Sequence, residues 1–217
     1  MISKRIKFIA SLIDENDSVL DIGTDHALLP IYLIKNNITK IADGSDVSET
    51  ILLNAINNLL EYRLNEKIKL YCSDGISNID ISKYNTFVIA GMGFHTIKGI
   101  LSHNKFDNIN KLIIQSNNNH DELRKFINSI GYKIISDFYI KDKNKSYLIV
   151  LCEKGKQKLS NKEYICGLYN KNNIWYYKYM VDKYNQILKL IPDCEKKDIL
   201  NNIKYFNEYL SKEKTEE

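Results

Sequence analysis

Short, mostly apolar runs alternate with amphipathic stretches through the first 130 residues of the chain. The runs have the pattern of buried strands, and the predicted strands span residues 19–22, 40–46, 67–72, 86–90 and 111–117. Apolar positions at helical spacing predict helices over residues 3–13, 27–35, 48–60, 94–101 and 121–130. One helix followed by five strand–helix repeats predicts an α/β fold with a doubly wound, mostly parallel sheet covered on both faces.

The repeats end in two strands of a different kind. Residues 132–139 and 146–152 have strand character, and the polar residues 141–145 lie between them. Two strands joined by a short polar turn predict an antiparallel hairpin, which we place after the parallel part of the sheet.

From residue 154 onward the pattern becomes helical. Residues 163–191 form one helical run, either continuous or broken near residues 171–173, and a second apolar stripe occupies positions 199, 203, 206 and 210. Two such stripes predict an antiparallel pair of helices. We therefore expect two domains, a sheet domain over residues 1–155 and a small helical, coiled-coil-like domain over residues 156–217.

The helical part is rich in aromatic side chains. Those on the apolar stripe, such as Tyr177, are expected in the core of the helix pair. Trp175, Tyr176, Tyr179 and Tyr205 lie off the stripe. The pattern leaves open whether these four pack in the core or stack on nucleic-acid bases.

The composition is that of a globular protein, with 44% hydrophobic and 27% charged residues. No apolar run approaches the roughly 20 residues that span a bilayer, and no signal peptide pattern is present, so neither a membrane partner nor secretion is expected. Four cysteines occur without a C-x-x-C pair, at positions 72, 152, 166 and 194. We expect them to be reduced, in a cytoplasmic protein without a metal site.

The net positive charge of the chain comes from its last part. Residues 1–153 hold 18 basic and 18 acidic side chains, whereas residues 154–217 hold 13 basic and nine acidic ones. A basic surplus of this size is compatible with a nucleic-acid partner without requiring one.

The end of the first predicted strand carries the first candidate site. Asp21 ends the strand and Gly23 opens a turn into a helix, the geometry that brings a nucleotide-like ligand to a sheet edge. The dinucleotide fingerprint G-x-G-x-x-G is absent, because Asp25 and His26 follow the single glycine. A ligand with a cationic centre would tolerate Asp25 better than a pyrophosphate would. The alternative is a strand, turn and helix that bind nothing.

Polar residues or glycines recur at the ends of the other predicted strands. Asp46 lies 25 residues beyond Asp21, where nucleotide-binding sheets hold ribose hydroxyls. The remaining strand ends carry Asp74 with Gly75, then Gly91, Met92 and Gly93, and then Gln115 and Asn117. The carboxyl ends of parallel strands line one crevice in a doubly wound sheet, so this recurrence favours a single ligand site there.

These residues resemble a known family, the bacterial tRNA (adenine-22 N1)-methyltransferases. The resemblance covers nearly the whole chain and rests on the motifs at residues 3–5, 21–30, 89–93 and 147–150. It implies a Rossmann-like domain that binds S-adenosyl-L-methionine, followed by a helical domain that contacts tRNA. The chain departs from the family pattern at Phe94, where a glycine is usual, and at Ser116, where a proline is usual. Both departures concern the pocket for the target base.

The resemblance also implies roles for individual residues. Gly23, Asp25 and His26 would surround the methionine part of the cofactor, with Asp21 near its amino group. Asp46 would hold the ribose, and Asp74 with Gly75 would border the adenine ring. Gly91 and Met92 would also border the cofactor. The catalytic candidates, which would grip the target base, are Asp25, His26, Gln115 and Asn117, beside the backbone of residues 91–93.

Two alternatives remain open at the level of sequence. The chain could be another class I methyltransferase with a different RNA or a small-molecule substrate. It could instead be a Rossmann-type binding module without catalytic activity, whose helices form a dimerisation arm. For the methyltransferase we expect a monomer or a weak homodimer.

Overall fold

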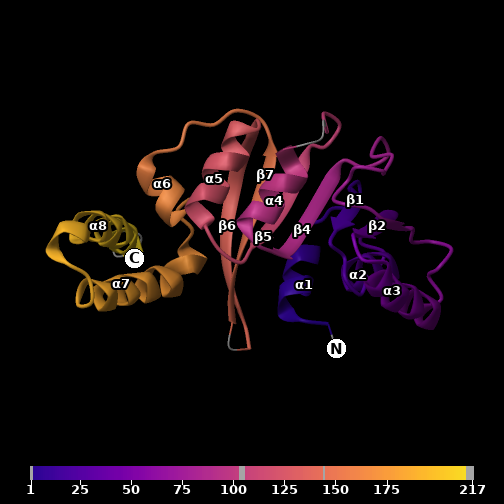
Figure 1. Ribbon diagram of the computed structural model, residues 1–217, viewed down its shortest axis with the longest axis horizontal. Coiled ribbons are helices and arrows are strands. Elements are labelled where there is room, and N and C mark those ends of the chain that lie inside the picture. The colour runs from indigo at the N-terminus through magenta and orange to yellow at the C-terminus, as the bar shows by residue number, and fades with distance from the viewer. Residues whose placement is uncertain (1, 103–105, 144, 214–217) are drawn as a thin grey trace.

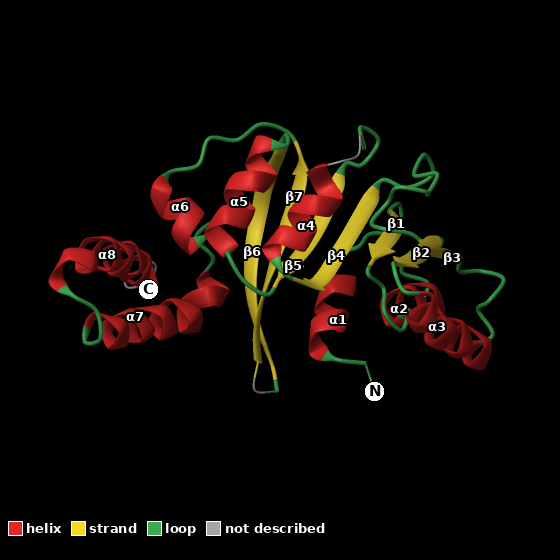
Figure 2. Ribbon diagram, viewed as in Figure 1, coloured by secondary structure: helices red, strands yellow, loops and turns green. Residues whose placement is uncertain are grey.

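A single seven-stranded sheet forms the centre of the molecule (Figures 1 and 2). The computed structural model describes residues 2–102, 106–143 and 145–213. The strand order is β3-β2-β1-β4-β5-β7-β6. The strands are β1 Ser18–Ile22, β2 Ile41–Asp46, β3 Leu70–Cys72, β4 Thr86–Met92, β5 Lys111–Ser116, β6 Tyr132–Asp142 and β7 Lys145–Lys154. Strands β1 to β5 pair in parallel and β7 is antiparallel to both β5 and β6, which confirms the predicted fold class.

Helices cover both faces of this sheet, as the strand–helix alternation predicts. The helices of this part are α1 Lys4–Ala10, α2 Leu28–Lys35, α3 Glu49–Tyr62, α4 Phe94–Ser102 and α5 His120–Ser129. Side chains alternate along each strand, so Val19 and Val88 pack with α1 and α2, whereas Leu20 and Phe87 pack with α4 and α5. All four are fully buried.

Some strand bounds differ from the prediction. Strand β3 has only three residues. Strand β4 continues through the Gly91 turn to Met92, with an irregular register between Ala90 and Met92. The hairpin strands run on to Asp142 and from Lys145; Asn144, in the predicted turn, lies outside the described residues.

The C-terminal part holds α6 Asn161–Cys166, α7 Ile174–Leu188 and α8 Lys196–Glu213, with two short 3-10 turns, η1 Lys171–Asn173 and η2 Asp193–Glu195. Helices α7 and α8 form the predicted antiparallel pair, since Lys178 pairs with Glu213 and, farther along α7, Tyr184 packs on Phe206. A continuous helix over 163–191 is wrong, because α6 ends at Gly167, whose φ of +81° is the left-handed region. A side chain there would lie 2.6 Å from the Asp137 carboxylate.

One buried ion pair connects the sheet to the C-terminal helices. Arg124 on α5 donates to Asp137 on β6 at 2.9 Å, and both side chains are fully buried. Arg124 also donates to the carbonyl of Tyr164 on α6, while Asp137 accepts the Leu168 N–H. The core is continuous across this junction, and it includes Tyr177 on α7. The division at residue 155 stays a prediction.

No helix within the described ranges has both the length and the apolar character needed to cross a membrane.

Candidate functional site

The carboxyl ends of β1, β2 and β4 border two adjoining cavities. The sheet order reverses between β1 and β4, since β2 and β3 lie on one side and β5 on the other. Ligands of open α/β sheets bind at such a point. The His26 cavity, of about 350 Å³, is lined by Arg5, Asp21, Gly23, Asp25, His26, Asp46 and Met92, among others. The Asp74 cavity, of about 390 Å³, is lined by Gly23, Asp46, Ser73, Asp74, Gly75 and Met92, among others.

Gly23, Asp46 and Met92 line both cavities and so mark their junction. Gly23 has a φ of +73°, and a Cβ there would lie 2.0 Å from the Met92 methyl carbon. The left-handed backbone favours glycine at this turn, and a side chain there would have to displace the Met92 methyl group. Asp25 also has a left-handed backbone, with a φ of +53°, which for a residue with a side chain is unusual and concentrated at functional sites.

Asp21 lies at the base of the His26 cavity and is 6% exposed. Its carboxylate accepts a hydrogen bond of 2.7 Å from the Thr24 hydroxyl. Burial raises the pKa of Asp21 to about 6, and the nearby Arg5 guanidinium opposes part of that rise. A cationic group bound beside a buried carboxylate stabilises its charged form, because the cation compensates the hydration that the carboxylate has lost.

Asp25 and His26 lie at the mouth of the same cavity. Their side chains are 64% and 49% exposed, and His26 Nε2 lies 3.5 Å from Asp25 Oδ1. The Asp46 carboxylate accepts from the Asp25 N–H at 3.4 Å and from the Ser48 N–H at 3.0 Å. The backbone of the turn thus fixes Asp46 between the two cavities, as predicted for an acid at the end of the second strand.

Gln115 and Asn117 lie in a third cavity rather than in the first two. This Asn117 cavity, of about 560 Å³, is lined by Arg5, Gly91, Gln115, Ser116, Asn117, His120, Lys145, Ser146 and Tyr147. It shares Arg5 and Gly91 with the His26 cavity. The structure therefore places all predicted site residues along one connected track.

A chain of hydrogen bonds orients the amides of the Asn117 cavity. Arg5 donates to Gln115 Oε1 at 2.8 Å, Gln115 Nε2 donates to Asn117 Oδ1 at 3.0 Å, and Asn117 Nδ2 donates to the Gly91 carbonyl at 2.9 Å. Gln115 is 1% exposed and Asn117 is exposed. Asn117 is therefore the residue that can meet a ligand, and Gln115 orients it.

Arg5 lies in the site; from the sequence, a basic residue at this place could either serve a ligand or an RNA phosphate or belong to a solvated helix start. It reaches from α1 to the edge of the sheet, where its guanidinium lies 5.1 Å from the Tyr147 ring centre. Its sequence signals are a basic residue in the first turn of a helix, which opposes the helix dipole, and a place in the family motif at residues 3–5. Tyr147 lies in the family motif at residues 147–150, but no pattern in the sequence pairs it with Arg5.

No group of three or more His, Cys, Asp or Glu side chains that could hold a metal ion occurs among residues 2–102, 106–143 and 145–213.

Comparisons with known proteins agree with this arrangement. A family profile described as "Methyltransferase domain" matches residues 2–150. A provisionally named tRNA methyltransferase of Mycoplasma genitalium is 35% identical over 76% of this chain and 76% of the relative. The tRNA (adenine(22)-N(1))-methyltransferase of Bacillus subtilis is 28% identical over 71% of this chain and 66% of the relative. The solved structure of M. capricolum TrmK with S-adenosyl-homocysteine has a TM-score of 0.84 and 31% identity, and covers 97% of this chain and 98% of that one.

Proposed function

Because the chain belongs to the bacterial tRNA (adenine-22 N1)-methyltransferase family, we propose that it transfers the methyl group of S-adenosyl-L-methionine to N1 of adenine 22 in tRNA. The observation that carries this proposal is the pair of cavities that meet at Asp46. The fold, the cofactor class and the tRNA methyltransferase activity agree with the named relatives. The roles of single residues are our proposal.

The shape and chemistry of the two cavities fit this cofactor. An elongated molecule with an adenosine end and an amino-acid end needs two compartments joined at the ribose, and Gly23, Asp46 and Met92 form that junction. The two cavities are lined by four acids, Asp21, Asp25, Asp46 and Asp74, and by one guanidinium, that of Arg5, which suits a ligand with a sulfonium and an ammonium. When bound, S-adenosylmethionine supplies an activated methyl group on its sulfonium.

Each acid then has a chemical partner. The carboxylate of Asp46 accepts from the two ribose hydroxyls, and Asp74 accepts from the exocyclic amine of the cofactor adenine, because a carboxylate is purely an acceptor. The buried carboxylate of Asp21 holds the ammonium. Gly23 and Gly75 allow the backbone to approach the ligand closely.

The target adenine would enter through the Asn117 cavity, which adjoins the His26 cavity at Arg5 and Gly91. Adenine N1 lies on the Watson–Crick edge, so the base must leave its stack before transfer. Asn117 offers an amide to that edge. Phe94 is 5% exposed and lines none of the three cavities of the site.

The reaction needs positioning more than acid–base chemistry. Neutral adenine carries a lone pair on N1, so no proton has to be removed before methyl transfer. The methylated base is cationic, and the exposed carboxylate of Asp25 would stabilise that charge as it develops. His26 contacts Asp25 and is assigned an orienting role. Most of the rate enhancement is then expected from in-line placement of the two substrates.

The proposal assigns the body of the tRNA to the basic C-terminal helices and the enzyme to the cytoplasm, where tRNA is found. A monomer or weak homodimer stays a prediction.

The test is nucleoside analysis by mass spectrometry of in vitro transcribed tRNA after incubation with the protein and S-adenosylmethionine. We expect 1-methyladenosine in the wild-type transcript, and none when adenine 22 is replaced by guanine or inosine. A different methylated nucleoside would identify another methyltransferase substrate. Absence of methylation from every cognate tRNA would favour the binding module.

A further inference from the structure

A fourth cavity, outside the site described above, lies between α5, α6, α7 and α8. This tyrosine cavity has a volume of about 580 Å³, within the range of about 300–1,000 Å³ usual for small-ligand sites. Its lining residues are Asn119, His120, Asp121, Lys125, Asn161, Ile165, Tyr176, Met180, Tyr184, Asp198, Asn201, Asn202 and Tyr205. Most are aromatic or amide side chains.

The rings of the cavity are held firmly. Tyr176 stacks on Tyr139 with ring centres 3.4 Å apart and an interplanar angle of 12°, and Tyr139 accepts a hydrogen bond from Arg124. Tyr184 is half-buried and packs against Phe206. Tyr205, on α8, is half-buried as well. The cavity therefore presents fixed aromatic surfaces.

The amides of the cavity have hydrogen-bonding capacity to spare. Within the part of the chain that the structure describes, the side chains of Asn161 and Asn201 make no hydrogen bond to another residue. His120 Nε2 lies 3.3 Å from the Ser116 carbonyl. A carbonyl can only accept, so Nε2 is the donor and Nδ1 is left as an acceptor.

The charge of the cavity argues against an anion. Asp121 pairs with Lys125 at 3.4 Å, and Asp198 adds a further negative charge. His120 is neutral at pH 7, because burial and the nearby Arg124 lower its pKa to about 4. The net negative charge of the lining would repel a phosphate or a carboxylate. A neutral, flat group that forms hydrogen bonds could instead stack on the rings and bond to the amides.

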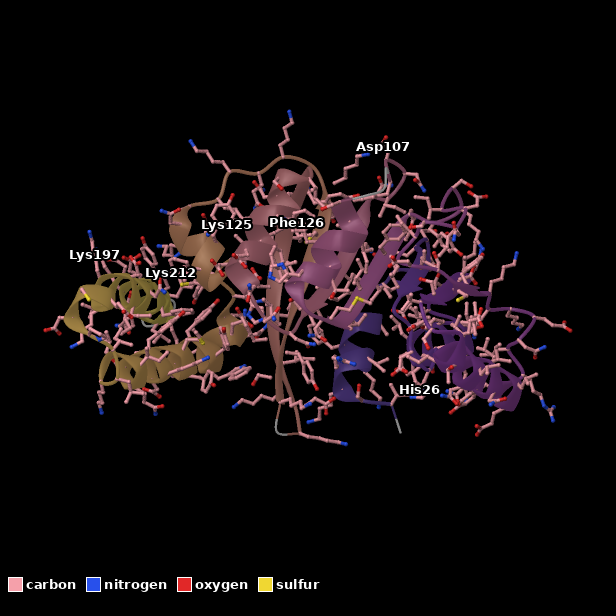
Figure 3. All side chains as sticks on the ribbon, viewed as in Figure 1. His26, Asp107, Lys125, Phe126, Lys197 and Lys212 are labelled. Atoms are coloured by element: carbon pink, nitrogen blue, oxygen red, sulfur yellow. The ribbon has the colours of Figure 1, made fainter. Side chains whose placement is uncertain are left out.

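The tyrosine cavity adjoins the proposed substrate path at one residue, His120. His120 lines both the tyrosine cavity and the Asn117 cavity, which in turn shares Arg5 and Gly91 with the His26 cavity. In Figure 3, the labelled His26 lies on the cofactor side of the β6–β7 hairpin and the labelled Lys125 and Lys197 lie on the other side. A tRNA whose target base occupies the Asn117 cavity would therefore have the tyrosine cavity within reach of its other nucleotides.

We propose that the tyrosine cavity binds a second unpaired nucleobase of the tRNA, distinct from the base that is methylated. This inference rests on the proposed function. Rings give stacking to any base, and the free amides read the edge of a base that is not paired. The second base would fix the register of the tRNA, so that adenine 22 alone reaches the Asn117 cavity.

The test combines protein variants with tRNA transcripts that each carry one abasic site. Tyr205→Leu removes a ring while retaining apolar packing, and Asn201→Leu, at an exposed position, removes an amide that has no hydrogen-bond partner among the residues that the structure describes. Matched controls are Tyr62→Leu on α3 and Asn207→Leu on α8, which alter exposed residues outside the cavity. The dissociation constant for tRNA and the methylation rate at saturating tRNA are measured for each pair.

We expect both cavity variants to raise the dissociation constant about tenfold on intact tRNA, with little change in the saturated rate and none in the controls. One abasic position other than 22 should weaken wild-type binding by the same factor and leave the cavity variants unaffected. The inference would be overturned if the effects of a cavity variant and of an abasic site on the dissociation constant were additive at every tRNA position. It would also be overturned if both variants bound tRNA with wild-type affinity and had unaltered unfolding curves. Failure of the wild type to methylate intact tRNA would instead overturn the proposed function.

Discussion

At the scale of single residues, the candidate site contains Asp21, an acid whose burial in the folded protein costs free energy. The carboxyl is 6% exposed and has one side-chain hydrogen bond, from Thr24. Burial raises its pKa from the ordinary value of 3.8 to about 6. The charge that would bind the cofactor ammonium therefore destabilises the protein when no cofactor is bound.

This cost has a defined pH dependence. Between pH 4 and pH 6 the folded chain retains a proton that the unfolded chain has released, so stability falls as pH rises through this window and stays lower above it. Asp21→Asn keeps an oxygen that can accept the Thr24 hydrogen bond, and it removes the loss of stability that comes from ionising a buried carboxyl. We expect the variant to gain about 2 kcal/mol of unfolding free energy at pH 7.5 and almost nothing near pH 4, measured by urea unfolding. An equal gain at both pH values would contradict this explanation.

The same variant should bind the cofactor more weakly. Titration calorimetry with S-adenosylmethionine should show affinity falling below pH 6 for the wild type, as Asp21 becomes protonated, and little pH dependence for Asp21→Asn. A variant that binds as tightly as the wild type at pH 7.5 would remove Asp21 from the cofactor site.

Asp25 is the residue assigned to the developing charge on the target base. Asp25→Asn should lower the single-turnover rate at saturating tRNA about 10- to 100-fold. His26→Gln should have a much smaller effect, because the chemistry requires no general base. An unchanged rate in Asp25→Asn would exclude a catalytic role for Asp25.

At the scale of elements, the Arg124–Asp137 pair determines where the C-terminal helices attach. Arg124→Met would leave Asp137 charged, buried and without its cation, so we expect a loss of about 3–5 kcal/mol in unfolding free energy. The neighbouring Lys125→Met, at an exposed position, should change stability by less than about 0.5 kcal/mol. Chemical denaturation of both variants at pH 7.5 makes the comparison. Equal small effects would show that the pair contributes little to the junction.

The elements also show what sequence can predict. The spacing of apolar residues along the chain predicts β1, β2, β4 and β5 with their helices, because the side chains that a strand or helix buries recur at its own period. The helical period does not reveal the end of α6 at Cys166, because Asp137, which leaves room only for a glycine at position 167, lies 30 residues earlier in the chain. The sequence suggests a ligand role for Arg5 without its partner, because Gln115 is 110 positions away. Contacts between distant residues leave no periodic signal.

At the scale of the whole molecule, residues 1–153 carry equal numbers of basic and acidic side chains, and the basic surplus lies in residues 154–217. Binding of tRNA through lysines releases counterions, so the dissociation constant should rise steeply with salt. Lys197→Gln, on α8, should reduce the slope of log Kd against log salt by up to about one unit. Lys67→Gln, between α3 and β3, serves as the control. An identical slope in both variants would mean that α8 is not part of the tRNA surface.

The contact between α1 and the β6–β7 hairpin has a consequence for synthesis on the ribosome. The Arg5 backbone N–H donates to Asp142 across 137 positions of the chain. At a translation rate of about 5–20 residues per second, α1 waits on the order of ten seconds for this partner. We therefore expect a nascent chain that has already formed the turn at Gly23 to lack the hairpin that positions Arg5.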